Sequence, residues 1–121
     1  MNKVAIIRKE SFVIAKSKKK VENSFAVIND GKEITIVMEQ ESASSEKFIE
    51  FQKDYKLITF NMTLPFEMVG FISNISQSLA REKIPIFVIS AYSTDHLLVK
   101  NKYSEKAVEA LETLGFEVKS L

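Results

Sequence analysis

The sequence predicts an α+β fold made of two fused βαββαβ units in tandem, of which the first is degenerate and the second complete. In the second half of the chain, short segments rich in β-branched and aromatic residues alternate with amphipathic helical segments. In the first half the same order of strands recurs with its first helix reduced to a turn. The length of 121 residues suits one compact domain or two very small ones fused, and 45% hydrophobic with 27% charged residues is typical of a globular protein.

The first half contains four segments rich in β-branched or aromatic residues that we expect to form strands. These segments are 4–8, 11–16, 24–28 and 33–39. Between the last two lie Asn29, Asp30 and Gly31, and because these residue types tolerate positive φ, they predict a hairpin. Ser45 and the apolar residues after it predict a short amphipathic helix that ends near Lys53.

The second half begins with a predicted strand at 57–62 and continues into a helix. Pro65 suits the first helical position, where no backbone donor is needed. Apolar residues then recur at spacings of four, three and four, which places them on one helical face. These residues are Met68, Ile72, Ile75 and Leu79. Pro85 ends this helical pattern.

Two more strands are predicted at 86–89 and 97–100, separated by a polar turn. Ser104 can cap a last helix, and Gly115 can supply the left-handed residue that ends it. A final strand follows at 116–118. Strand, helix, strand, strand, helix, strand is the order of the ferredoxin-like fold, in which both helices cover one face of an antiparallel sheet. We therefore expect a degenerate unit at 1–54 and a complete one at 55–121.

Composition excludes several classes of function. The sequence has seventeen Lys and Arg residues and sixteen Asp and Glu residues, which gives a net charge of +1. No overall electrostatic field therefore attracts nucleic acid or an anionic membrane. The sequence contains no Cys and one His, which leaves thiolate and metal chemistry poorly supplied. No apolar run approaches the roughly 18 residues of a membrane span. We expect a cytoplasmic protein without metal or cofactor and with no nucleic-acid or membrane partner.

The start of the predicted long helix is a candidate site for an anion. Leu64 precedes Pro65 and has no side-chain acceptor, so the first amides of the helix, at 66–68, lack an obvious cap. With the helix dipole behind them, these donors favour a carboxylate. Gly70 would let a ligand or another backbone approach. In the alternative interpretation, Thr63 or Asn61 caps the turn and Gly70 only allows close helix packing.

A second candidate region precedes the strand at 97–100. Asp95 offers a negative charge for an ammonium group, with the hydroxyls of Ser90, Ser93 and Thr94 beside it. The alternative is an ordinary turn aspartate that bonds to its own backbone. We assign His96 no catalytic role, because no partnered Ser or Cys nucleophile accompanies it. The lysines at 16 and 18–20 are expected to form a solvated turn rather than a phosphate site.

Two stretches carry a resemblance to a known family. Residues 64–71 read LPFEMVGF and residues 84–100 read IPIFVISAYSTDHLLVK, and together they resemble the ACT domain. More narrowly, they resemble small tandem ACT-like proteins related to aspartate kinase regulatory domains and to the cytosolic arginine sensors of animals. The likeness is most specific at 89–95 and 98–100, and extends more generally upstream through 4–16 and 24–39.

The resemblance implies a non-catalytic regulatory sensor of a small molecule, often an amino acid, bound where two ACT units meet. It also implies pairing of units, and we expect a homodimer. Combined with the residues above, it predicts a ligand site on the two loops. Its expected members are Thr63, Leu64, Pro65, Phe66, Val69, Gly70, Ser90, Ala91, Tyr92, Ser93, Thr94 and Asp95.

Two other functions stay open. The first is a protein–protein interaction module whose ligand pocket is not functional. The second is an acylphosphatase-like enzyme, which would need an arginine in a phosphate-binding loop before the first helix. Thr63, Leu64 and Pro65 occupy that loop, and the arginines of the chain, Arg8 and Arg81, lie elsewhere in the sequence.

Overall fold

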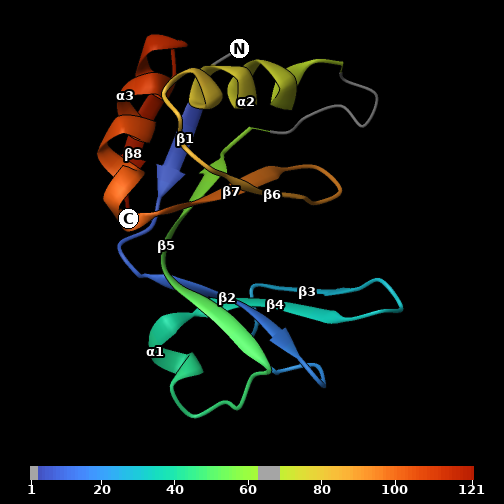
Figure 1. The fold of residues 1–121 in the computed structure, drawn as a ribbon. Coiled ribbons are helices and arrows are strands. Elements are labelled where there is room, and N and C mark those ends of the chain that lie inside the picture. Colours follow the sequence, from blue (N-terminus) through green and yellow to red (C-terminus); the bar gives the residue numbers. More distant parts are fainter. Residues whose placement is uncertain (1–2, 63–68) are drawn as a thin grey trace. The chain divides into compact units, whose positions relative to one another are not determined.

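The computed structural model describes residues 3–62 and 69–121, and these fold into two units (Figure 1). The split unit combines Met1–Lys9 with Lys56–Leu121, and the inserted unit is Glu10–Tyr55. The junction thus lies one residue from the expected boundary after residue 54. The N-terminal segment, which we expected in the first unit, groups with the C-terminal part of the chain instead.

The split unit contains a five-stranded sheet in the order β8-β1-β5-β7-β6, to which β5 contributes its last residues. Its elements run β1, β5, α2, β6, β7, α3 and β8 along the chain, with a 3₁₀ turn before α3. Their bounds are β1 Val4–Ile7, β5 Glu50–Phe60, α2 Phe71–Arg81, β6 Phe87–Ser90, β7 Asp95–Lys100, α3 Ser104–Thr113 and β8 Glu117–Ser120. From β5 onward the order is βαββαβ, which confirms the predicted ferredoxin-like fold.

Strand β1 takes a place that the sequence did not indicate. It lies between β5 and β8, with Ala5 opposite Phe60 in an antiparallel ladder and opposite Val118 in a parallel one. The first and last strands of the βαββαβ unit are therefore separated by a strand from the other end of the chain. The expectation of a wholly antiparallel sheet is wrong at this edge, because β1 and β8 run in the same direction.

One face of this sheet packs against both helices, which lie on the same side of it (Figure 1). The period of two in a strand sends alternate residues to this face, so that Ile58 and Phe60 of β5 point toward the helices together with Leu97 and Val99 of β7. The buried cluster also includes Ala5, Ile75, Leu79, Ile84, Ala107, Ala110, Leu111 and Phe116. The predicted apolar face of the long helix is thus confirmed at Ile75 and Leu79.

The ends of the two helices differ in part from prediction. Helix α2 begins at Phe71, and the expected start at Pro65 lies outside the described residues. Ser104 is the first residue of α3 and does not cap it, because its hydroxyl donates to the carbonyl of Asn101 at 2.8 Å. Gly115 has a φ of 96° just after α3 and ends the helix as predicted.

The inserted unit is a four-stranded antiparallel arrangement in the order β3-β4-β2-β5, to which β5 contributes its first residues. The other elements are β2 Phe12–Ser17, β3 Ala26–Asn29, β4 Ile34–Glu39 and α1 Gln40–Ala43. The predicted hairpin between β3 and β4 is confirmed. Gly31 has a φ of 88°, and its amide donates to Asn29 Oδ1 at 3.0 Å.

The helix predicted from Ser45 to near Lys53 is wrong. The helix of this unit is the four-residue α1, and the chain is already in strand β5 from Glu50. Strand pairing explains the difference, since the amide of Ile49 donates to the carbonyl of Lys16 at 2.8 Å and Phe51 lies opposite Ala15. Hydrogen bonding to β2 therefore decides the conformation of a segment whose apolar spacing also suits a helix.

The core of the inserted unit is small. Its buried residues come from β2, β4 and α1, with partly buried apolar side chains packed around them. The buried residues are Val13, Ala15, Ile36, Met38 and Ala43. No helix joins β2 to β3, as predicted for the degenerate unit, so α1 is the helical cover of this face in the described chain.

Candidate functional site

The predicted site residues fall on two segments of the split unit and one segment outside the described structure. Thr63, Leu64, Pro65 and Phe66 belong to the stretch 63–68, which the structure does not describe. Val69 and Gly70 stand directly before α2, and the remaining six residues form the end of β6, the connecting loop and the first residue of β7. In Figure 1 the start of α2 and the β6–β7 loop lie toward the same end of the split unit.

Helix α2 starts without a side-chain cap. Its N-cap residue is Gly70, which has no side chain to offer, and the amide of Asn74 makes the first helical hydrogen bond to the Gly70 carbonyl at 3.1 Å. The amides of residues 71–73 therefore have no acceptor within the helix. Val69, which precedes them, is 94% exposed. An uncapped helix start was predicted from sequence, but at Leu64 and Pro65 rather than here.

The backbone conformation at position 70 explains why a glycine occupies it. Its φ is 85°, in the left-handed region, and a Cβ built there would meet no described atom within 4 Å. Glycine is thus not needed here to make room for a neighbouring helix or for another backbone segment among the described residues. A side chain would instead strain the backbone, so a substitution here tests conformation before it tests binding.

The β6–β7 loop is a tight polar turn. Ser90 and Asp95 are opposite each other in the ladder, and the amide of Ala91 donates to the carbonyl of Thr94 at 2.9 Å. Ala91, Tyr92 and Ser93 are exposed, with Tyr92 83% accessible. Within residues 90–95 the loop thus carries hydroxyl groups, an aromatic ring and the partly buried Asp95.

His96 is held as a strand residue beside this loop. Its Nδ1 lies 2.9 Å from Thr59 Oγ1 of β5. Burial lowers the pKa of His96, and the charge of Arg8 lowers it further, against a smaller opposing effect of Asp95. The imidazole is thus biased toward its neutral form and makes a hydrogen bond inside the sheet.

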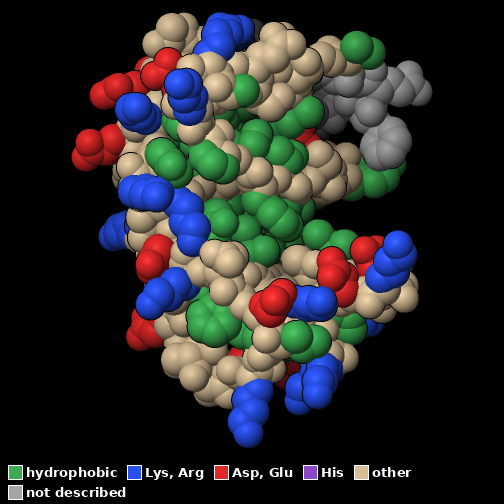
Figure 2. Space-filling view, in the orientation of Figure 1, with side chains coloured by type: hydrophobic (Ala, Val, Ile, Leu, Met, Phe, Trp, Pro, Cys, Tyr) green, Lys and Arg blue, Asp and Glu red, His purple; other side chains and the backbone are tan. Residues whose placement is uncertain are grey.

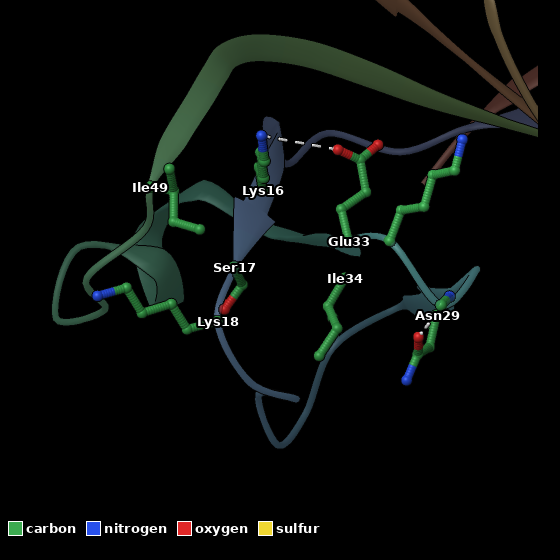
Figure 3. A pocket seen from close by; sticks show the side chains of 9 residues that line it. Lys16, Ser17, Lys18, Asn29, Glu33, Ile34 and Ile49 are labelled. Carbon is green, nitrogen blue, oxygen red and sulfur yellow. Dashed lines mark hydrogen bonds and ion pairs between the residues drawn. The ribbon is translucent and has the colours of Figure 1, made fainter.

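Two hollows were not predicted. One, of about 370 Å³, lies in the inserted unit between the end of β2 and the β3–β4 hairpin (Figure 3). Lys16 on its wall pairs with Glu33 at 3.8 Å, and Figure 3 shows Lys18 extending away from this pair. The other, of about 210 Å³, lies in the split unit beside α2. Its residues are far apart in the sequence, which is why no local pattern could have found it.

Charges are mixed over the visible surface. On the face shown in Figure 2, Lys and Arg side chains are interspersed with Asp and Glu in both units rather than gathered in a basic patch. Within residues 3–62 and 69–121, no group of three or more His, Asp or Glu side chains lies close enough together to hold a metal ion. Over the same stretches, no helix combines the length and apolar character needed to cross a bilayer.

Comparison with known sequences finds one family. A family model described as ACT domain matches residues 50–113, more than half of the chain. The matched region runs from the start of β5 through α3 and so contains the β6–β7 loop and the start of α2. No curated protein matches the sequence.

Solved structures share the fold at low sequence identity. A protein from Agrobacterium tumefaciens aligns over 100% of this chain and 95% of its own, with a TM-score of 0.84 and 20% identity. A putative C-terminal regulatory domain of aspartate kinase from Porphyromonas gingivalis covers 92% and 95%, with a TM-score of 0.62 and 18% identity. The ligand-free regulatory subunit of aspartate kinase from Thermus thermophilus covers 90% and 94%, with a TM-score of 0.63 and 8% identity.

Proposed function

Because the chain belongs to the ACT domain family, we propose that it is a non-catalytic regulatory protein that senses an amino acid, with the cytoplasm as its expected location. The observation that carries the proposal is the uncapped start of α2 at Gly70, in the same unit as the polar β6–β7 loop. Two solved structures of similar fold, from Porphyromonas gingivalis and Thermus thermophilus, are described as regulatory parts of aspartate kinase, which supports a regulatory role.

The start of α2 suits the carboxylate of an amino acid. Three amides without helical acceptors point along the axis, and the positive end of the helix dipole lies behind them. Each such interaction is worth about 0.3 to 1 kcal/mol at an exposed position, and more where water is excluded. We therefore propose that the carboxylate binds at 70–73. The expected site residues at 63–66 lie outside the described part of the chain.

The β6–β7 loop suits the ammonium group and the side chain of the same ligand. The Asp95 carboxylate supplies the opposite charge, and the hydroxyls of Ser90, Ser93 and Thr94 supply further polar contacts. Exposed Tyr92 offers an aromatic surface. In this proposal the twelve predicted residues form one ligand site.

A second ACT unit completes this site in the proposal. Val69 and Gly70 before α2 are exposed, as are residues 90–93 of the β6–β7 loop. A small ligand bound to one of these exposed segments would have little of its surface buried from water. A partner copy placed over the loops would bury the ligand from the other side. The ligand would then favour the paired state by its difference in affinity for paired and unpaired protein, which is how a binding site becomes regulatory.

Calorimetric titration with each of the twenty amino acids tests the proposal. We expect heat with one or a few of them and a matching rise in the melting temperature. Light scattering after gel filtration, with and without that amino acid, tests pairing. If all twenty give neither heat nor a thermal shift, the protein–protein interaction module becomes the better reading.

A single-charge variant sharpens the test at the helix start. Ser73→Asp adds an acidic group to the exposed first turn of α2. There it interacts favourably with the helix dipole, and its carboxylate competes with the ligand carboxylate for the same backbone amides. We expect equal or higher thermal stability with at least tenfold weaker binding, about 1.4 kcal/mol. Thr113→Asp adds the same charge to the exposed last turn of α3 and controls for the effect of added charge on affinity. Its stability should fall slightly, because the added charge lies at the negative end of that helix dipole. Equal affinity in both variants would remove the helix start from the site.

The acylphosphatase-like alternative has its own assay. Arg81 lies in the last turn of α2 rather than in a loop before it, so the chain offers no arginine where such an enzyme would hold phosphate. We expect purified protein to leave acetyl phosphate at the uncatalysed rate. Hydrolysis that disappears in Arg81→Ala would contradict the proposed function.

A further inference from the structure

The hollow beside α2 in the split unit has an apolar floor. Phe71 and Ile75 line it from α2, and Leu114 and Phe116 line it from the segment that joins α3 to β8. The rings of Phe71 and Phe116 meet edge to face with centroids 6.3 Å apart, which fixes their orientation. These side chains belong to the main buried cluster or pack against it, so the floor is part of the folded core rather than a mobile surface.

The rim of this hollow is polar and follows one stripe of α2. Asn74, Gln77 and Arg81 are spaced by three and four residues, so they lie one above another on the same helical face. All three are exposed and line the hollow. Two carboxamides and a guanidinium therefore border an apolar floor at regular intervals.

Lys3 supplies a second cation on the opposite wall. Its Nζ donates to the carbonyl of Leu114 at 3.2 Å and lies 5.7 Å from the ring centroid of Phe116. These two contacts hold the ammonium group over the aromatic floor. None of the described residues that line the hollow is acidic, so among them Lys3 and Arg81 give it a local charge of plus two.

We propose that this hollow binds a small carboxylate with an apolar or aromatic body. The body would pack on Phe71 and Phe116, and the carboxylate would accept hydrogen bonds from Arg81, the group best suited to bidentate contact. The volume of about 210 Å³ is below the roughly 300 to 1,000 Å³ of sites for drug-sized ligands, which sets the size class of the ligand. This site adjoins the one proposed at 70–73, with which it shares Phe71, but it extends along α2 to Arg81 and does not rest on the proposed function.

Residue-resolved NMR with phenylacetate as the probe tests this inference. We expect saturable shifts in the amide signals of Asn74, Ile75, Gly115 and Phe116. Phenylacetamide, which has the same ring and no charge, should bind at least about tenfold more weakly, because a hydrogen bond to a charged group is worth more than a neutral one. Equal affinity for the two compounds would overturn recognition of a carboxylate.

Variants on the exposed face of α2 separate the two halves of the site. Arg81→Gln should weaken phenylacetate binding about tenfold or more, whereas Lys106→Gln, on exposed α3, should leave it unchanged. Asn74→Phe should fill the hollow and abolish the shifts. Ala80→Phe adds the same ring at an exposed α2 position outside the hollow and should retain them.

The location of the shifts distinguishes this site from the proposed amino-acid site. Shifts confined to Gly70 and residues 90–95 would assign phenylacetate to the other site and overturn this inference. Absence of any saturable shift with phenylacetate in the low millimolar range would also overturn it. Neither result would bear on the calorimetric test with amino acids.

Discussion

The split unit and the inserted unit share an order of strands but differ in how one sheet face is covered. In the split unit two helices of ten and eleven residues lie on that face, and twelve described residues are buried in the resulting core. In the inserted unit a four-residue helix takes this role, and the buried cluster beneath it has five described residues. Strand pairing therefore survives the loss of a helix, whereas the size of the core does not.

The difference also separates the functions that each unit can carry. The helix start and the hollow described above both depend on α2, for which the inserted unit has no counterpart between β2 and β3. The hollow of the inserted unit is bordered by lysines, one of them already paired with Glu33. The two features for which we propose a carboxylate ligand thus both belong to the complete unit.

The largest effect is expected in the core of the split unit. Phe60 is fully buried, and its ring contacts those of Phe71 and Phe116 at centroid distances of 5.5 and 5.4 Å. Phe60→Ala should lower the free energy of unfolding by about 3 to 5 kcal/mol, through lost burial and the cavity left behind. Urea denaturation followed by circular dichroism measures this. A loss below about 1 kcal/mol would mean that this cluster is not the main core.

A matched pair of isoleucines compares the two cores directly. Ile58 in the split unit and Ile36 in the inserted unit are both fully buried strand residues. Replacement by alanine should cost about 2 to 5 kcal/mol, with Ile58→Ala near the upper end and Ile36→Ala near the lower, because the smaller core collapses more easily around a cavity. Urea midpoints of the two variants give the comparison. The reverse order would contradict the ranking of the cores.

Glycine substitution tests the backbone at the start of α2. Gly70→Ala places a Cβ on a residue with a φ of 85° and should cost about 1 to 2 kcal/mol. Gly70→Asn should cost less, since asparagine adopts this conformation more readily. Thermal melts of both variants measure the difference. An equal loss of stability in the two variants would indicate that the added side-chain volume, and not the left-handed backbone, matters at this position.

The smallest effect is a pH dependence at His96. Its pKa is lowered in the folded protein, so the unfolded chain binds more protons below about pH 6.5. Stability is therefore fully present above that pH and decreases as the pH falls toward the folded pKa. Melting temperatures between pH 7.5 and 5.5 should show this decline, and His96→Gln should flatten it. An unchanged slope in the variant would assign the decline to other groups.

Much of the fold follows from local patterns in the sequence. The hairpin at Asn29 and Gly31, the apolar face of α2 and the end of α3 at Gly115 each depend on residues close together in the chain. The helix predicted over 45–53 fails because the spacing of its apolar residues also suits a strand, and pairing with β2 decides the outcome. Length and composition alone do not resolve such a case.

Other features depend on partners that the local sequence does not specify. The short apolar, β-branched-rich run of β1 predicts a strand, but it does not predict that β1 lies between β5 and β8. The polar residues of the β6–β7 loop could be identified by type, whereas the hollow beside α2 requires Lys3, Phe71 and Phe116 to meet from three distant segments. Only the folded chain reveals such a combination.

The position of β1 has a consequence for synthesis on the ribosome. Residues 4–7 are translated before their parallel neighbours, residues 117–120, which follow more than 100 positions later in the chain. The intervening Glu10–Tyr55 can form its hairpins from contacts that are all available earlier. The apolar strand at 4–7 therefore lacks one of its two neighbours until residues 117–120 are made, and during this interval its free edge is exposed to aggregation or to chaperones.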